Sequence, residues 1–262
     1  MSDVAPEAPA PARQLAGRTA VVTGSGQNIG RAIALALAAQ GANVVVNGHA
    51  HRELVDSVVE EAQALGAGAI GVMADVSEPE EVDSLVAAAQ DAFGAVDIAV
   101  SNVGVRMRQS FEEITIDDWH RTLASNLHAA FYLAHFALPG MRQRGWGRII
   151  HISGYDGWTG HMDQRAHNVT AKAGMHGLTK AIAREYGVHG VTANTVAPGA
   201  IATVRDAEQY VHVDLDAIRK RLAVPTFGQP EDIAAACVYL AGESGRFVTG
   251  QVIHVNGGEF MF

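Results

Sequence analysis

Cysteine and lysine are both scarce in this chain of 262 residues. The single cysteine, Cys237, cannot form an intrachain disulfide, and its apolar neighbours predict a small core residue. Only three lysines occur among the 19 lysines and arginines, and the formal net charge is −9. This balance argues against nucleic acids and anionic membranes as partners, because both require a basic surface.

Long apolar runs are also absent. No segment approaches the roughly 20 apolar residues that span a bilayer. Residues 1–13 are rich in alanine and proline and have neither the basic start nor the apolar stretch of a signal peptide. We therefore expect a flexible tail over 1–13, one domain over 14–262 and a cytoplasmic location.

Short apolar runs alternate with longer helical patterns along the chain. The predicted strands are residues 19–23, 42–47, 69–75, 96–101, 147–153, 191–197 and 251–255, and the helical patterns are 31–41, 52–65, 79–93, 116–141, 167–186 and 230–240. Nearly continuous apolar strands are typical of parallel sheets covered on both faces. The alternation predicts a single-domain α/β fold, namely a Rossmann-like, doubly wound sheet of seven parallel strands in a three-layer α/β/α arrangement.

Two irregular segments, 154–166 and 198–212, each follow the carboxyl end of a predicted strand. Open α/β sheets bind ligands at that edge. We therefore expect these segments to be the substrate loops.

A glycine-rich turn follows the first predicted strand and leads into a helix. It reads Thr23-Gly24-Ser25-Gly26-Gln27-Asn28-Ile29-Gly30. Glycines permit a tight turn there, and the free N–H groups and dipole of the helix N-terminus favour a pyrophosphate. The turn predicts a dinucleotide site with contacts from Gly24, Gln27, Asn28, Ile29 and Gly30.

This turn resembles the TGxxxGxG loop of the short-chain dehydrogenase/reductase family. Gly24 and Gly30 are in place, but Asn28 replaces the middle glycine. Asparagine is the side chain next best suited to left-handed backbone angles, so the turn can survive. Its side chain could either crowd a pyrophosphate or donate to it.

Further segments carry the same resemblance over about residues 16–258, most closely to β-ketoacyl reductases. Asp75-Val76 resembles the pair beside the adenine, Ser101-Asn102-Val103-Gly104 resembles the NNAG element, and Pro198-Gly199 with Ile201 and Thr203 resembles the PGxIxT segment over the nicotinamide. The chain end, Gly250 to Gly258, resembles the terminal strand. The resemblance implies cofactor contacts from Asp75, Val76, Asn102, Gly104, Lys172, Pro198, Gly199, Ile201 and Thr203.

The end of the second predicted strand bears on the choice of nicotinamide cofactor. NAD-preferring members carry an acidic residue there for the ribose 2′-hydroxyl. Here the strand ends Val46-Asn47-Gly48-His49, without a carboxylate. We expect Asn47 and His49 to lie near the cofactor, with His49 or Arg52 available to a 2′-phosphate, and NADP(H) to be preferred over NAD(H).

The resemblance also implies a catalytic set of Asn, Ser, Tyr and Lys. Asn126 and Lys172 match two of these positions, whereas Asn168 stands at the tyrosine position and Gly154 at the serine position. Ser153 matches only after a shift of one residue. Asparagine forms hydrogen bonds but does not pass a proton, and general acid–base catalysis contributes roughly 10²–10⁴-fold.

Other side chains are candidates to replace the missing tyrosine. Tyr155, His161 and His167 lie in or beside the 154–166 loop, although each also fits an ordinary packing or capping role. The spacings of His151, His161 and His167 fit no compact ligand motif, so no metal site is expected. Arg106 and Arg108 fit either a clamp for a carboxylate or phosphate or a solvated loop.

These features favour an NAD(P)-dependent oxidoreductase that acts on the CH–OH group of a small or medium carbonyl or alcohol substrate, with an altered acid–base centre. The alternative is a protein that keeps the cofactor for non-redox chemistry (lyase, hydrolase or isomerase) or for a binding role. The lost Tyr and Ser favour the alternative, and the retained Asn126 and Lys172 favour the enzyme.

The resemblance further implies a homotetramer, or at least a dimer, that pairs through the long helices at 116–141 and 167–186 and through the last strand. The first of these carries more large apolar residues than one core-facing stripe requires: Trp119, Leu123, Leu127, Phe131 and Leu133. The chain also ends in Phe260-Met261-Phe262. We expect this tail to contact a second subunit or the mouth of its active site.

Overall fold

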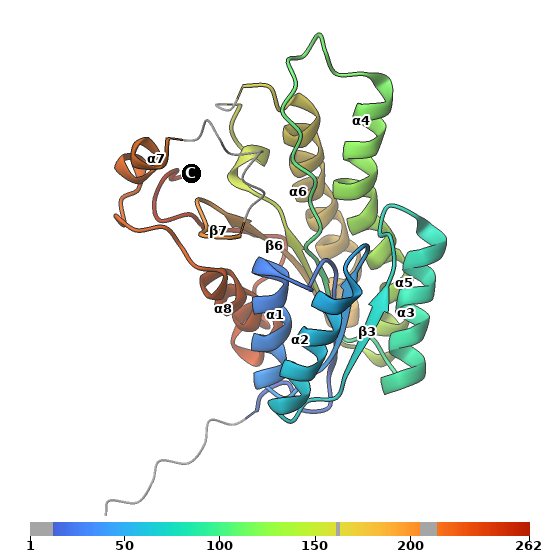
Figure 1. Cartoon of the computed structure of the whole chain (residues 1–262). Helices are drawn as coiled ribbons and strands as arrows, with labels where there is room; N and C mark the ends of the chain where they lie inside the picture. The colour runs from blue at the N-terminus through green and yellow to red at the C-terminus, as the bar shows by residue number, and fades with distance from the viewer. Residues whose placement is uncertain (1–12, 161–162, 205–213) are drawn as a thin grey trace, which may run out of the picture.

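One sheet forms the centre of the molecule in the computed structural model, which describes residues 13–160, 163–204 and 214–262 (Figure 1). Within these ranges seven parallel strands lie in the order β3-β2-β1-β4-β5-β6-β7. They are β1 (Thr19–Val22), β2 (Asn43–Gly48), β3 (Ala69–Met73), β4 (Ile98–Ser101), β5 (Gly147–Ile152), β6 (Val191–Pro198) and β7 (Val252–Val255). The predicted doubly wound parallel sheet is confirmed.

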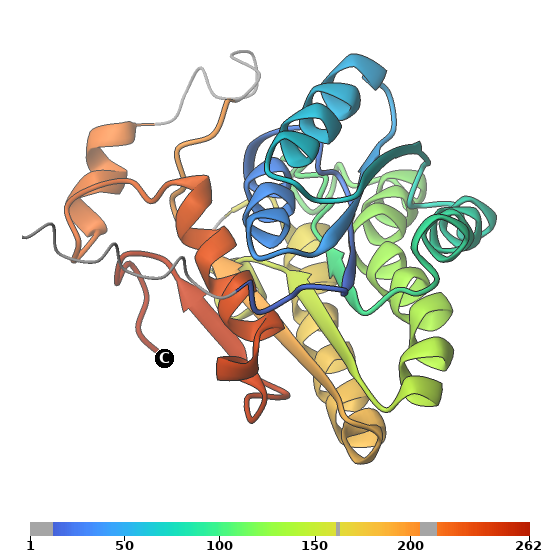
Figure 2. The same cartoon turned by 90° about the horizontal axis from the view of Figure 1, so that it is seen from below.

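Helices cover both faces of the sheet (Figure 2). On one face lie α1 (Asn28–Ala39), α2 (Arg52–Ala64) and α8 (Pro230–Ala241); on the other lie α3 (Pro79–Phe93), α5 (Ala129–Arg144) and α6 (Ala166–Tyr186). Figure 2 shows α8 beside α1 and α3 beside α5. The expected three layers and single domain are therefore present.

Two hydrophobic cores, one on each face, hold these layers together. Ile33 and Leu37 of α1 pack in the same buried cluster as Ile233 of α8. Leu85 of α3 and Leu133 of α5 belong to the cluster on the opposite face. Each such fully buried side chain stabilises the fold by roughly 1.5–3 kcal/mol.

The structure differs from the sequence prediction in two helical regions. The helix expected over 116–141 is α4 (Ile116–Leu123), a π-helical turn at Ala124–His128, and then α5, which runs to Arg144. A short helix, α7 (Leu215–Arg221), was not predicted. The sequence signal for this helix is Asp214, because aspartate is a preferred N-cap residue. In the structure its side chain accepts a hydrogen bond from the Ala217 N–H (2.9 Å).

The ends of the described ranges bear on two further expectations. Residues 1–12 of the predicted tail lie outside the described residues, whereas the Arg13 guanidinium donates to the Leu65 carbonyl (3.0 Å), so the folded part includes residue 13. Across the described ranges, no helix has both the length and the apolar character needed to cross a membrane.

The strand order reverses beside β1, which lies between β2 and β4. The chain leaves β1 and β4 toward opposite faces of the sheet, so a crevice opens at their carboxyl ends. The segments after β1, β4, β5 and β6 meet at this edge, and they contain most of the predicted site residues.

Candidate active site at the carboxyl ends of the strands

A cavity of about 360 Å³ lies at this edge and is hereafter called the strand-end cavity. It is lined by Gly24, Gln27, Asn28, Ile29, Gly30, Asn102, Val103, Gly104, Arg106, Ile152, Ser153, Lys172, Pro198, Gly199, Ile201 and Thr203. Segments from four strand ends thus surround one space. Most of the residues expected at the cofactor are among them.

The glycine turn after β1 brings the backbone close to this cavity. Gly24 has φ +59°, and a Cβ on Gly30 would lie only 2.2 Å from the Gly24 carbonyl oxygen. Gln27, the N-cap of α1, forms no capping hydrogen bond with its side chain. The first N–H groups of α1 therefore remain available to an anion, as a pyrophosphate site requires.

Two buried asparagines hold the turn in place. The Asn47 Oδ1 accepts from the Gly24 N–H (3.1 Å), and its Nδ2 donates to the Ala74 carbonyl (3.1 Å). The Asn102 Nδ2 donates to the carbonyls of Thr23 (3.0 Å) and Gly24 (3.1 Å). The amide of Asn47 is thus directed to the backbone of the turn and of the segment after β3, not to the cavity.

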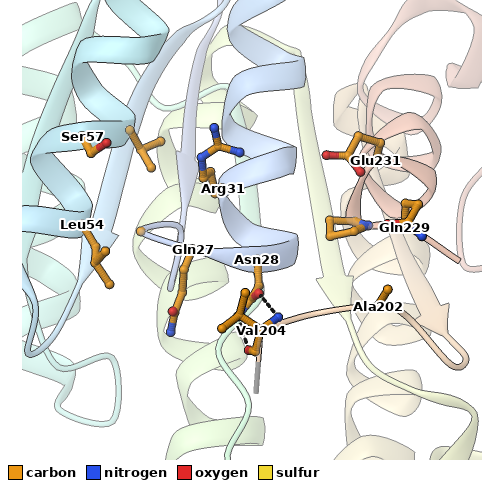
Figure 3. A pocket seen from close by; sticks show the side chains of 12 residues that line it. Gln27, Asn28, Arg31, Leu54, Ser57, Ala202, Val204, Gln229 and Glu231 are labelled. Atoms are coloured by element: carbon orange, nitrogen blue, oxygen red, sulfur yellow. Dashed lines mark hydrogen bonds between the residues drawn. The ribbon is translucent and has the colours of Figure 1, made fainter. Parts of the chain in front are cut away.

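Asn28 occupies the position where the sequence departs from the family loop. It has φ +50°, the left-handed conformation expected there. Its side chain accepts from the Val204 N–H (2.9 Å) and donates to the Val204 carbonyl (3.1 Å). Figure 3 shows these two bonds joining the start of α1 to the segment after β6, at the edge of a second cavity of about 570 Å³.

The end of β2 carries the residues expected near the ribose. His49 lies 3.3 Å from the Asp75 carboxylate, and Arg52 pairs with Asp56 (2.8 Å) on α2. Partial burial acts to raise the pKa of Asp75, but hydrogen bonds from Ser77 and the proximity of His49 outweigh it, so the pKa is lowered. Val76 is buried. This end of the site therefore holds one histidine, one arginine and two carboxylates.

At the opposite end of the strand-end cavity, Lys172 lines the space, and the amides of Asn126 and Asn168 meet nearby at the Val105 carbonyl. Lys172 of α6 is only 3% exposed, and its Nζ donates to the Ile152 carbonyl (3.1 Å). One turn earlier, the Asn168 Nδ2 donates to the Val105 carbonyl (3.1 Å). The Asn126 Nδ2 donates to the same carbonyl (3.1 Å) and to that of Thr122 (2.9 Å).

Asn126 lies within a π-helical turn at Ala124–His128. Its amide donates to the Thr122 carbonyl, one turn earlier in the helix. Such π-turns occur mainly as single insertions at functional sites. The Oδ1 atoms of Asn126 and Asn168 are buried and have no hydrogen-bond partner among the described residues, so both remain able to accept a proton donor.

Burial dominates the electrostatics of Lys172. Desolvation is the largest cause; together with nearby Arg106, and against the opposing effect of Asp156, it lowers the pKa of the amine to about 7. Asp156 itself is buried and pairs with Arg165 at 3.6 Å. Near neutral pH, Lys172 therefore divides between its protonated and neutral forms.

Ser153, Gly154 and Tyr155 follow β5. The Ser153 hydroxyl forms a hydrogen bond with His176 Nε2 (2.8 Å), which directs it toward α6. Gly154 has an extended backbone, and the nearest atom to an added Cβ is the Asp156 nitrogen at 4.0 Å. The Tyr155 ring packs against Phe260, with centroids 4.8 Å apart, and burial followed by Glu259 and Asp156 raises its pKa to about 12.

The remaining candidates lie elsewhere. His167 is fully buried, receives the Asn168 N–H on its Nδ1 (3.0 Å) and does not line the strand-end cavity. His151 is buried against Thr179 (2.8 Å). His161 lies outside the described residues. Within the described ranges no group of three or more His, Cys, Asp or Glu side chains is arranged to hold a metal.

Two contributors to the site were not anticipated from the sequence. His176 lies four residues after Lys172 on the same face of α6, so its pairing with Ser153 could have been suspected from helical spacing. The Val105 carbonyl, which accepts both Asn126 and Asn168, gives no signal in the sequence because it is a backbone atom.

Comparisons with known proteins agree with this architecture. A family profile described as Enoyl-(Acyl carrier protein) reductase matches residues 24–259. The 3-oxoacyl-[acyl-carrier-protein] reductase of Staphylococcus aureus is 36% identical over 245 residues, covering 93% of this chain and 98% of its own. The D-beta-hydroxybutyrate dehydrogenase of Cupriavidus necator is 36% identical over 256 residues, again covering 93% of this chain and 98% of its own.

Solved structures of similar fold are also dehydrogenases or reductases. A short-chain dehydrogenase from Burkholderia cenocepacia, crystallised in complex with NADP, has a TM-score of 0.87 and 32% identity, covering 94% of this chain and 99% of its own. A dehydrogenase/reductase from Sinorhizobium meliloti has a TM-score of 0.87 and 33% identity, covering 95% and 98%. This chain is therefore an oxidoreductase of the short-chain dehydrogenase/reductase family.

Proposed function

We propose that the protein binds NADP(H) in preference to NAD(H) and reversibly reduces a small or medium carbonyl compound to the alcohol. The observation that carries this proposal is the strand-end cavity, which is lined both by the glycine turn after β1 and by Lys172. The same space thus offers an anion-binding turn and a titratable amine. Bound nicotinamide would supply or accept the hydride.

The residues present fit such a cofactor. The turn from Gly24 to Gly30 would hold the pyrophosphate, since its N–H groups are uncapped and no Cβ at Gly30 fills the cradle. The adenine side would rest near Asp75 and Val76, and the nicotinamide side near Gly104 and the stretch from Pro198 to Thr203. Lys172 would reach the adjoining ribose.

Preference for NADP(H) is supported by the end of β2. That strand ends at Gly48, and the side chains nearby include His49 and Arg52, which would turn from their present carboxylate partners to a 2′-phosphate. Asp75 is the opposing charge and lies beside His49. A family relative crystallised with NADP supports the same choice.

At the reacting end, this chain's own residues would bind the substrate oxygen and exclude water. Asn168 and Gly154 stand where the family resemblance places a tyrosine and a serine. The unpartnered Oδ1 atoms of Asn126 and Asn168 can accept a substrate hydroxyl or a water. Arg106 lines the cavity and would attract a carboxylate or phosphate on the substrate.

The names of two relatives suggest the first compounds to test. They act on 3-oxoacyl thioesters and on D-β-hydroxybutyrate, both oxygenated at the β-carbon of an acyl group. NADPH absorbance should fall in the presence of protein and an acetoacetyl thioester, or rise when NADP⁺ is given with 3-hydroxybutyrate. Cofactor binding without any turnover over a broad carbonyl panel would favour the non-redox or binding alternative.

We further propose a homotetramer. Phe131 of α5 is 46% exposed, and the tail residues Met261 and Phe262 are 80% and 61% exposed. Phe262 packs against Trp158 and His254 of its own chain and leaves the rest of its surface available to a neighbour. Light scattering should give about four times the 27.6 kDa chain mass, and a particle of one chain mass would contradict the assembly.

A further inference from the structure

Acid–base groups are few in the strand-end cavity. Among the described residues that line it, only Arg106 and Lys172 have side chains that carry a charge. An arginine guanidinium stays protonated in proteins and does not exchange its proton during turnover. Lys172 is thus the one lining group described here that can both give and take a proton near neutral pH.

The other candidate donors either do not line this cavity or already have a hydrogen-bond partner. The Tyr155 ring lies against Phe260, its pKa is raised to about 12, and it does not line the cavity. His167, in the first turn of α6, is fully buried and does not line the cavity either. The Ser153 hydroxyl is bonded to His176 (2.8 Å).

The position of Lys172 fits the role of proton donor, which Tyr155, His167 and Ser153 do not fill. Its Nζ lies 3.3 Å from the point that a Cβ on Gly104 would occupy, and Asn126 Oδ1 lies 3.1 Å from the same point. The lysine amine and the Asn126 amide oxygen therefore face a common space beside the Gly104 backbone. Asn168 stands where the family resemblance places a tyrosine, and its shorter side chain donates to the Val105 carbonyl. No phenol from this position therefore lies between the Lys172 amine and the substrate.

From this arrangement, and resting on the proposed function, we infer that Lys172 itself exchanges the proton with the substrate oxygen. In reduction, protonated Nζ donates its proton to the carbonyl oxygen while the carbonyl carbon gains the hydride that NADPH gives up. The C=O bond becomes CH–OH, Lys172 is left as a neutral amine and NADP⁺ remains. Solvent then returns the proton to Nζ, and alcohol oxidation follows the reverse course.

Every charged or titratable group around Lys172 bears on this role. Arg106 approaches from the loop after β4 and Asp156 from the turn after β5, while His151 lies on β5 and His176 on α6. Burial lowers the pKa of His151 to about 3 and that of His176 to about 4, so both are neutral at pH 7. With its own pKa near 7, Lys172 holds both forms that an acid–base catalyst needs.

The first test measures Lys172 without any cofactor or substrate. The chain has three lysines, Lys172, Lys180 and Lys220, so protein labelled with carbon-13 at lysine Cε gives three assignable NMR signals. The Lys172 signal should titrate near pH 7, with Lys220→Arg and Lys180→Arg as the assignment controls. A Lys172 signal that does not titrate near pH 7 would overturn the inference even if the enzyme is active.

The second test exchanges the amine. Lys172→Cys, at a position that lines the strand-end cavity, followed by 2-bromoethylamine installs a lysine analogue of lower basicity. The other thiol, Cys237, does not line that cavity, and because burial raises its pKa it stays unmodified. Lys172→Cys should lose roughly 10²–10⁴-fold in kcat, and alkylation should restore turnover with the pH profile moved to lower pH.

Three outcomes separate the failures. Full turnover by unalkylated Lys172→Cys, or a restored enzyme whose pH profile does not move, overturns the role of Lys172 and leaves the proposed function standing. Absence of NADPH binding by the wild-type protein contradicts the proposed function instead. The carbon-13 titration decides the state of Lys172 in either case.

Discussion

The Asn28 side chain is bonded to both backbone polar groups of Val204, accepting from the N–H at 2.9 Å and donating to the carbonyl at 3.1 Å. The contact joins residues 176 positions apart, across the edge where a pyrophosphate would rest. A glycine at position 28, as in the family loop, could not form this contact, because it has no side chain. Cofactor entry must proceed past this contact or break it.

Replacing Asn28 should therefore change cofactor affinity. Asn28→Gly keeps the left-handed backbone and removes both bonds, each worth about 1 kcal/mol, so the Kd for NADPH should fall by up to about thirtyfold. Asn28→Asp is the matched control, since it keeps the shape but sets a negative charge beside the pyrophosphate and should weaken binding. If Asn28→Gly binds more weakly, Asn28 donates to the cofactor instead of obstructing it.

Gly30 provides a steric test of the turn. A Cβ there would lie 2.2 Å from the Gly24 carbonyl oxygen, so Gly30→Ala should weaken NADPH binding at least about tenfold and lower the Tm. Gly177→Ala on α6 is the control, because nothing lies within 4 Å of its added Cβ. That change should leave binding unaltered and stabilise the helix by about 0.5–1 kcal/mol. Equal behaviour of the two variants would place the pyrophosphate elsewhere.

Restoring the family residues should strengthen ordinary ketone reduction. The double variant Asn168→Tyr with Gly154→Ser supplies a phenol one turn before Lys172 and a hydroxyl where an added Cβ has its nearest neighbour at 4.0 Å. We expect kcat to rise about tenfold or more on generic ketones or diketones. The comparison requires a double variant that stays folded and binds NADPH. An unchanged rate under those conditions would mean that the substrate pocket itself differs from that of ordinary members.

Stability should depend on pH through the buried imidazoles. Burial lowers the pKa of His151 to about 3 and that of His176 to about 4, against 6.5 for an ordinary histidine. Between these values the unfolded chain binds more protons than the folded one, so the free energy of unfolding should decrease as pH falls from about 6.5 to 4. Urea denaturation over this range measures the slope.

The contribution of His176 can be isolated. His176→Gln keeps a hydrogen-bonding group near Ser153 but does not titrate, so the slope should fall by up to about 1.4 kcal/mol per pH unit. Parallel curves for wild type and His176→Gln would show that this imidazole is not held neutral.

Local pattern predicted the fold and the cofactor turn well. Apolar strands and the Gly24–Gly30 turn are signals contained within a few neighbouring residues, and the structure places all seven strands where they were expected. The π-helical turn around Asn126 could not be predicted in this way. It depends on the packing of its helix against α6 and not on propensity.

The interior of the site was harder to predict because its contacts join distant segments. Asn47 was expected at the ribose but holds the Gly24 turn, since β2 lies beside β1 only in the folded sheet. The Ser153–His176 pair and the Asn28–Val204 contact likewise link separate elements. Sequence patterns can indicate that such residues matter, but which partners they contact depends on the topology and packing of the fold.

The central claim is that this is an NADP(H)-dependent oxidoreductase, and cofactor titration tests it most directly. Quenching of protein fluorescence, or enhancement of NADPH fluorescence, should give a Kd in the micromolar range, with NADH binding more weakly because β2 ends without a carboxylate. Gly30→Ala serves as the negative control. Saturable micromolar NADPH binding is the predicted result, and no binding at millimolar NADPH or NADH would contradict the account.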